Sequence, residues 1–268
     1  VRELSEHKVW SALGRLASKK EKGTAKKDPV VGVLGCMAER EGEGIIARMP
    51  NVDVLCGPSN LDQLPMLVDN AYSTRASQVS LAGHNSRRSR TRDHGADQLE
   101  NLDLSRTFSP ADGTSKAQAY VRITRGCNKF CSFCVVPYTR GPEVHRPPNH
   151  IVDEVKRLVD SGVLEVTLLG QTINHYLSDE GGKKTSFADL LWRVHEEVPG
   201  LQRLRFITSY PRDFSDDALD VMAAAPRICR YLHIPAQSGS NTMLRSMNRG
   251  YTVELYESLL ERARSRMP

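Results

Sequence analysis

The fold is decided by the stretch Ala119–Cys134, which reads AYVRITRGCNKFCSFC. Its first six residues alternate in polarity, which predicts a β-strand that leads through Arg125-Gly126 into a loop. That loop carries Cys127, Cys131 and Cys134 in the spacing C-x3-C-x2-C. The stretch therefore predicts a strand that delivers three cysteine thiols to one loop.

Three closely spaced thiolates suit a cubic iron–sulfur cluster in which one iron has no protein ligand. Electron-transfer clusters usually carry Cys at all four irons, so a three-cysteine site leaves one iron open to a small molecule. A structural zinc ion is the alternative, and it would need a fourth Cys or His in paired spacing. The next candidate ligand, His145, lies eleven residues after Cys134, and no second C-x2-C follows. The ligand count favours the cluster.

Apolar runs and helical patterns alternate after the cysteine loop, as is typical of parallel βα units. Asn149 is expected to cap the first helix and Gly162 to end it. An eight-fold barrel needs about 250 residues, so the pattern indicates a partial barrel of about four units. Beyond the opening strand, we expect strands at 163–169, 204–209 and 228–234, and helices at 149–162, 187–198, 216–225 and 253–264.

The N-terminal third also reads as a parallel α/β fold. A helical repeat of Val9, Leu13 and Leu16 precedes expected strands at 30–34 and 52–55 and expected helices at 43–48 and 62–70. The sequence thus predicts an N-terminal α/β domain at 1–80, a basic linker at 81–117 and the barrel at 118–268.

The composition sets wide limits on the class of protein. The 268 residues have a net charge of +5, which permits an RNA partner without requiring one. Six cysteines, three of them on one loop, do not make a disulfide scaffold and indicate a reducing compartment. We expect a cytoplasmic protein without a membrane span, because no run of 18 apolar residues occurs.

The cysteine trio, with Phe133 directly before the last Cys, resembles the signature of radical S-adenosylmethionine (SAM) enzymes. Three further segments resemble the methylthiotransferases among them, and most closely the MiaB branch, which acts on dimethylallyladenosine in tRNA. These segments are VVPYTRG at 135–141, LLGQTIN at 168–174 and HIPAQSGS at 233–240. The resemblance implies an N-terminal parallel α/β domain followed by a partial TIM-like radical SAM barrel. It also implies that both are truncated in this chain, with further strands and an RNA-binding TRAM domain beyond residue 268.

The resemblance implies two [4Fe–4S] clusters in the complete protein. Cys127, Cys131 and Cys134 would be the catalytic trio that holds the SAM-binding cluster. Cys36 matches the third ligand of a second cluster, whose other two ligands would lie upstream of residue 1. A buried free thiol is the alternative for Cys36. Cys56 and Cys229 match no ligand position and are expected to be packing residues.

The segments that follow the expected strands supply candidates for binding SAM, since active sites of parallel βα folds lie at the carboxyl ends of the strands. Ordinary turn chemistry is the alternative for Gly170 and Ser238, and a surface helix position is the alternative for Arg245. The candidates are Gly170, Gln171, Ser209, Gln237, Ser238 and Arg245.

Three basic residues flank the cysteine loop and are candidates for contacts with tRNA phosphates: Lys129, Arg140 and Arg146. General surface charge is the alternative reading of all three.

The resemblance implies an enzyme that methylthiolates carbon-2 of N6-dimethylallyladenosine at position 37 of tRNA, with SAM as methyl donor and radical source. Its partners would be the tRNA anticodon stem-loop and an electron donor such as flavodoxin, and we expect a monomer. One alternative keeps the chemistry and changes the substrate to threonylcarbamoyladenosine in tRNA or to an aspartate of a ribosomal protein. Another alternative is a non-catalytic metal-binding module that binds RNA.

Overall fold

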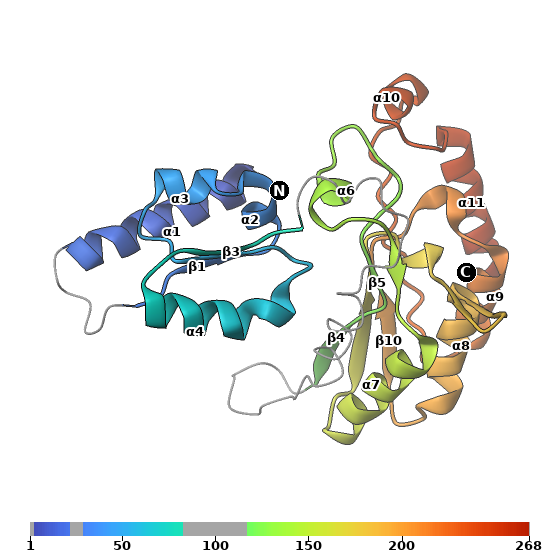
Figure 1. Cartoon of the computed structure of the whole chain (residues 1–268). Coiled ribbons are helices and arrows are strands. Elements are labelled where there is room, and N and C mark those ends of the chain that lie inside the picture. The colour runs from blue at the N-terminus through green and yellow to red at the C-terminus, as the bar shows by residue number, and fades with distance from the viewer. Residues whose placement is uncertain (1–2, 22–28, 83–116, 268) are drawn as a thin grey trace. The chain divides into compact units, whose positions relative to one another are not determined.

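The structure is a computed structural model that describes residues 3–21, 29–82 and 117–267 (Figure 1). The backbone divides into two compact units. The first comprises Val1–Asp103 with Val135–Pro142, and the second comprises Leu104–Cys134 with Glu143–Pro268. The expected basic linker at 81–117 lies almost wholly outside the described residues. None of the helices in the described ranges combines the length and apolar character needed to cross a membrane.

The first unit is built on a parallel three-stranded sheet in the order β1-β2-β3. Its strands are β1 (Gly32–Leu34), β2 (Val54–Cys56) and β3 (Gln78–Ser80). Its helices are α1 (Glu3–Glu21), α2 (Cys36–Glu41), α3 (Gly44–Arg48), α4 (Leu64–Thr74) and α6 (Val136–Thr139), with a 3-10 turn η1 (Leu61–Gln63) before α4.

Helices cover both faces of this sheet, as Figure 1 shows for α1 and α3 on one side and α4 on the other. The central strand β2 explains the arrangement, because successive side chains of a strand point to opposite faces. Leu55 packs in a buried cluster with residues of α1, α2 and α3, whereas Val54 and Cys56 pack with Leu67 and Ala71 of α4. All three β2 residues are fully buried.

The second unit contains a parallel sheet in the order β10-β7-β4. Its strands are β4 (Gln118–Arg122), β7 (Glu165–Leu169) and β10 (Arg203–Phe206), and two antiparallel pairs accompany them: β5 (Thr124–Arg125) with β6 (Val144–His145), and β8 (Leu177–Glu180) with β9 (Lys183–Ser186). Its helices are α7 (Pro148–Asp160), α8 (Phe187–Glu197), α9 (Asp216–Ala224), α10 (Asn241–Ser246) and α11 (Val253–Arg266), with 3-10 turns η4 (Ile173–His175) and η5 (Pro211–Asp213).

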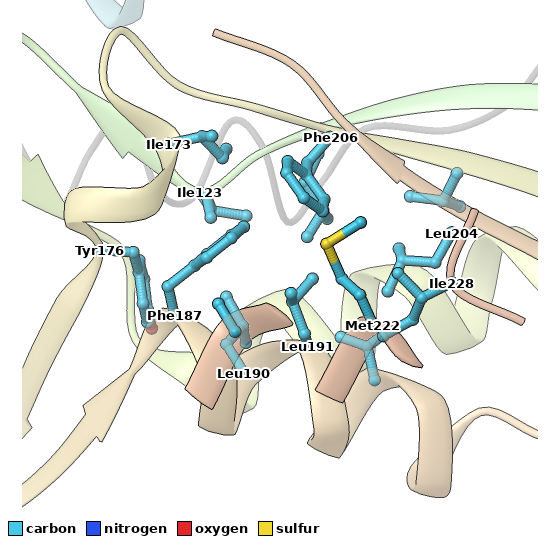
Figure 2. Packing of buried hydrophobic residues seen from close by; sticks show 14 of the residues in the cluster. Ile123, Ile173, Tyr176, Phe187, Leu190, Leu191, Leu204, Phe206, Met222 and Ile228 are labelled. Carbon is cyan, nitrogen blue, oxygen red and sulfur yellow. The ribbon is translucent and has the colours of Figure 1, made fainter. Parts of the chain in front are cut away.

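The core of the second unit lies between one face of its sheet and α7, α8, α9 and α11. Figure 2 shows this packing, in which the ring of Phe187 meets Phe206 edge-on with centroids 5.0 Å apart. The opposite face of the sheet is polar. There Glu165 bridges neighbouring strands through ion pairs with Arg203 and Arg205. The strands therefore alternate between an apolar face against the helices and a polar face.

The predicted α/β class with parallel sheets is confirmed, and the described strands do not close into a barrel. The strand expected at 228–234 is wrong, since only Ile228 forms a bridge, to Leu204 of β10. The backbone turns back at Tyr231, whose N–H donates to the carbonyl of Cys229. Further along, the N–H of Thr208 donates to the His233 ring rather than to a backbone carbonyl. These bonds replace the regular ladder of a fourth strand.

The expected cap of α7 is also wrong. The helix begins at Pro148, which suits the first helical position because its nitrogen carries no hydrogen to satisfy. Asn149 therefore lies inside the helix, and its side-chain oxygen accepts a hydrogen bond from Arg193. The expected end of α7 is confirmed, because Gly162 follows it with φ +99°, a conformation that favours glycine.

Candidate functional site

The three cysteines lie on the loop that follows β5. Cys127 and Cys131 are buried, Cys134 is half-buried, and all three are free thiols. The loop is shaped by two left-handed residues, Gly126 at φ 72° and Phe130 at φ 48°. The N–H of Cys134 donates to the carbonyl of Cys131, which closes a tight turn between them. A local turn thus brings the last two cysteines together.

Residues from three later segments contact the cysteine loop. Thr172, which follows β7, places its Oγ1 3.4 Å from the sulfur of Cys127. Asp213 of η5, which follows β10, forms an ion pair with Lys129. Met247, which follows α10, accepts a hydrogen bond from the backbone N–H of Ser132. Segments that follow β7, β10 and α10 therefore converge on the loop.

The environment of Cys127 favours its neutral thiol in the absence of a metal. Burial raises the pKa of this thiol, and hydrogen bonds from Thr172 and from the backbone at Lys129 oppose the shift only in part. A thiol must lose its proton to ligate iron, so binding of a cluster at Cys127 releases a proton.

Gly170 lies where the backbone after β7 passes close to β5, the strand that precedes the cysteine loop. A Cβ added to Gly170 would lie 2.3 Å from Oγ1 of Thr124 and 3.2 Å from the side chain of Ile173. Oγ1 of Thr124 and Oγ of Ser209 are both buried without a hydrogen-bond partner among the described residues. Buried hydroxyls normally have a partner, so these two atoms have capacity to hydrogen-bond with a polar ligand.

The structure does not bring all expected SAM-binding residues to the cysteine loop. Gln171 is half-buried directly after Gly170. Gln237 is exposed in a left-handed conformation, with φ 66°. Ser238 accepts a hydrogen bond from the N–H of Ser240, which is ordinary turn chemistry. Arg245 is exposed on α10 and donates to Thr242 of the same helix.

The arginine that reaches the cysteine loop is instead Arg249, which the sequence did not single out. Its Nη1 donates to the sulfur of Cys131 at 3.1 Å. The two residues are 118 positions apart, so no local pattern reveals the contact. Arg249 lies in the segment MNRGYT at 247–252.

Two of the three basic residues expected to contact tRNA phosphates are engaged inside the second unit. The ammonium of Lys129 is paired with Asp213, and its side chain is only 10% exposed. Arg146 is buried and forms an ion pair with Glu154 at 2.7 Å. Neither side chain is available to a phosphate in this conformation. Arg140 is half-buried in the first unit.

The remaining cysteines lie apart from this loop in the sequence. Cys36 is half-buried and begins α2, where Gly35 with φ 87° turns the chain from β1 into the helix. Cys56 is fully buried in β2, and its thiol lies 3.2 Å from the carbonyl of Asn60, as suits a packing residue. Cys229 is half-buried.

Comparison with known proteins identifies the family. Residues 121–268, more than half of the chain, match the Radical SAM superfamily. The chain belongs to the radical SAM superfamily. Residues 1–57 match the Uncharacterized protein family UPF0004. Membership of the superfamily implies SAM and a [4Fe–4S] cluster as cofactors.

Curated relatives confirm the narrower resemblance. The chain is 40% identical over 269 aligned residues to the tRNA-2-methylthio-N(6)-dimethylallyladenosine synthase of Neisseria meningitidis. It is 42% identical to the protein of that name from Chromobacterium violaceum and 38% identical to that from Francisella philomiragia. All of this chain aligns in each case, but it spans only 56% of each relative.

Solved structures agree at the level of the fold. The apo form of the cobalamin-dependent S-adenosylmethionine radical enzyme OxsB superposes with a TM-score of 0.61 at 13% identity, over 96% of this chain and 37% of that chain. The form with aqua-cobalamin and S-adenosylmethionine bound gives a TM-score of 0.58 at 11% identity, over 95% of this chain and 37% of that chain. These likenesses confirm a radical SAM fold for the chain.

The residues of the loop fit the implied cofactors. A cubic cluster takes each cysteine on a different iron, so its ligating sulfurs lie farther apart than the ligands of a single ion. Among the described residues, no group of three or more His, Cys, Asp or Glu side chains is arranged to hold a metal ion. Three free thiols without a fourth Cys or His in paired spacing suit a cluster better than zinc. The unpartnered hydroxyls of Thr124 and Ser209 suit the polar groups of SAM.

Proposed function

We propose that this chain is part of a tRNA-modifying enzyme that methylthiolates carbon-2 of N6-dimethylallyladenosine at position 37. The observation that carries the proposal is the convergence of Thr172, Asp213 and Met247 on a loop with three free cysteines. The proposal is supported by relatives that are named for this reaction and align with the whole chain.

In this proposal Cys127, Cys131 and Cys134 hold a [4Fe–4S] cluster and leave one iron for SAM. The bound cofactors supply the radical chemistry, in which one-electron reduction of SAM gives methionine and a 5′-deoxyadenosyl radical. The protein binds and orients the reactants. Gly170 lets the backbone pack closely against Thr124, and the buried hydroxyls of Thr124 and Ser209 bind polar groups of SAM.

The remaining expected roles belong to the same proposal. Cys36 is one ligand of a second cluster in the complete protein, which makes two clusters in all. Gln171, Gln237 and Ser238 are candidates for further SAM contacts, and Arg245 is the least favoured because it bonds within α10. The partners are the tRNA anticodon stem-loop and an electron donor such as flavodoxin, acting with a monomer in the cytoplasm.

The modified nucleoside tests the substrate. We propose to digest tRNA from cells that lack the gene for this chain, and to measure the 2-methylthio derivatives of both hypermodified adenosines by mass spectrometry. Loss of the 2-methylthio form of dimethylallyladenosine, with the threonylcarbamoyl derivative unchanged, is the expected result. Unchanged 2-methylthio-dimethylallyladenosine would overturn the substrate assignment. Loss of the threonylcarbamoyl derivative alone would support the alternative tRNA substrate.

A further inference from the structure

Arg249 donates a hydrogen bond to a cysteine of the loop. Its Nη1 donates to the sulfur of Cys131 at 3.1 Å, and its Nε donates to the hydroxyl of Tyr251 at 3.3 Å. The arginine is half-buried and Cys131 is buried. A guanidinium cannot lose its proton in a protein, so a full positive charge lies against this sulfur.

Two tyrosines hold the guanidinium in place. Its central carbon lies 4.8 Å from the ring centroid of Tyr210 and 5.2 Å from that of Tyr251, within the range of cation–π attraction. The two rings pack edge-to-face, 5.4 Å apart, in a buried cluster with Leu244. An arginine between two buried rings has few alternative rotamers, so its direction toward Cys131 is fixed by the packing.

The tyrosines are anchored by the backbone. The hydroxyl of Tyr251 lies 2.9 Å from the carbonyl oxygen of Ala236 and bonds to it, and the hydroxyl of Tyr210 accepts from the N–H of Gly250 at 2.8 Å. Buried tyrosines usually have a partner for the hydroxyl, and here one partner, Ala236, precedes α10 while the other, Gly250, follows it. The two tyrosines that enclose the guanidinium of Arg249, Tyr210 and Tyr251, are therefore held in place by the backbone of the surrounding fold.

The cysteine loop does not depend on Arg249 for its attachment. The side-chain amide of Asn248 donates to the carbonyl of Phe130 at 2.9 Å. The N–H and hydroxyl of Ser132 donate to the carbonyls of Met247 and Ser246. These bonds hold the segment after α10 to the loop without the guanidinium. The contact of Arg249 with the sulfur is thus an addition to an interface that is already formed.

We propose that Arg249 is a positioning residue that sets the reduction potential of the cluster held by Cys127, Cys131 and Cys134. Hydrogen bonds to ligating sulfurs and the local charge are among the factors that set the potential of an iron–sulfur cluster. Reduction adds one negative charge to the cluster. A fixed cation that donates to a ligating sulfur stabilises the reduced form more than the oxidised form and raises the potential. This inference rests on the proposed cluster at the three cysteines.

The test measures the potential of the cluster rather than activity. The full 268-residue chain with Cys36→Ala, which removes any cluster at that position, is reconstituted anaerobically with iron and sulfide and serves as parent. The reduced fraction is read by electron paramagnetic resonance at fixed ambient potentials set with dithionite, without SAM. Arg249→Met is compared with Arg264→Met, which removes the same charge from an exposed position on α11.

We expect Arg249→Met to lower the ratio of reduced to oxidised cluster about tenfold at fixed potential, which is about 59 mV for one electron. Arg264→Met should leave the ratio unchanged. Arg249→Lys keeps the positive charge but loses the planar guanidinium, so its ratio should lie between those of the two Met variants. If Arg249→Met binds too little iron to measure, Tyr251→Phe replaces it, because it removes the hydroxyl that accepts from Nε of Arg249 and should shift the potential in the same direction.

Equal potentials in Arg249→Met and Arg264→Met would overturn the inference while leaving the cluster assignment intact. Loss of iron in Arg249→Met, together with an unchanged potential in Tyr251→Phe, would make Arg249 a structural residue and would also overturn it. Failure of the parent chain to bind iron would instead overturn the cluster assignment on which the inference rests.

Discussion

Lys129 and Asp213, which are 84 positions apart in the sequence, form an ion pair that ties the cysteine loop to the segment after β10. Their side chains are 10% and 18% exposed, so solvent screens the pair only weakly. Lys129 also lies over the ring of Tyr210. The lysine between the first two cysteines therefore anchors the loop.

Removal of this ammonium should loosen the loop. We expect Lys129→Met to lower the free energy of unfolding by about 1.5–3 kcal/mol, the usual worth of a hydrogen bond to a charged group. Urea unfolding measures the change. Lys156→Met is the matched control, since the ion pair of Lys156 with Glu197 is 3.4 Å long and exposed on both sides. Its effect should stay within about 0.5 kcal/mol. Equal losses in the two variants would contradict the anchoring role.

The buried pair of Arg146 and Glu154 gives a second prediction. The two side chains are 1% and 5% exposed and lie 2.7 Å apart, and Arg146 also donates to the carbonyl of Arg122. Glu154→Gln would remove the carboxylate charge from this buried ion pair. We expect a loss of about 3–5 kcal/mol in unfolding free energy. Asp153→Asn, on the exposed side of the same helix, should cost less than about 0.5 kcal/mol. A loss below about 1 kcal/mol for Glu154→Gln would show that the pair is not buried as described.

Glu165 predicts a pH dependence of stability. Burial acts to raise the pKa of its carboxyl, but hydrogen bonds and charges from Arg203 and Arg205 outweigh that effect and hold the pKa below its ordinary value. A carboxyl with a lowered pKa in the folded state stabilises the fold above its unfolded pKa, about 4.3. The contribution is lost as the pH falls through the lower, folded pKa.

As the pH falls below about 5, we therefore expect the unfolding free energy of the unsubstituted chain to decrease more steeply than that of the Glu165→Gln variant. Denaturant titrations between pH 7 and the acid limit of folding measure both slopes. Glu257→Gln, at an exposed position on α11, should keep the slope of the parent. If the unfolding free energy of Glu165→Gln changed with pH as steeply as that of the unsubstituted chain, the Glu165 carboxyl would not contribute to the pH dependence of stability.

Close approach at Gly170 gives a steric prediction. The added Cβ of Gly170→Ala would lie 2.3 Å from Oγ1 of Thr124, and we expect a loss of about 1–3 kcal/mol from overpacking. Thr124→Ala removes Oγ1, the atom with which the new Cβ would clash. The double variant Gly170→Ala/Thr124→Ala should therefore lose less unfolding free energy than the sum of the losses in the single variants. Gly44→Ala is the control, because its Cβ would meet nothing within 4 Å and alanine favours a helix. Additive losses in the double variant would disprove the clash.

The sequence predicted the elements with regular periodicity and missed those that depend on distant partners. The helices at 187–198, 216–225 and 253–264 are confirmed within one or two residues as α8, α9 and α11. The segment 228–234 was expected to be a strand, but hydrogen bonds at Thr208 and Tyr231 break its ladder. The residue types of a short segment do not report where its backbone groups find their partners.

The candidate site shows the same limit. The spacing of the three cysteines is a local pattern, and it marked the loop on which the later segments converge. The roles of Lys129 and Arg249 depend on residues 84 and 118 positions away, and no spacing rule covers such pairs. Arg245 was a candidate for binding SAM, yet its side chain donates to Thr242 of the same helix.

The central claim is that Cys127, Cys131 and Cys134 bind one cluster that cleaves SAM. The most direct measurement is the yield of 5′-deoxyadenosine from SAM and dithionite, together with the iron content, after anaerobic reconstitution of the Cys36→Ala chain. We predict about four irons per chain and 5′-deoxyadenosine formation, both lost in Cys131→Ala and both kept in Cys229→Ala. One tightly bound zinc ion without SAM cleavage, or cleavage that survives Cys131→Ala, would contradict the claim.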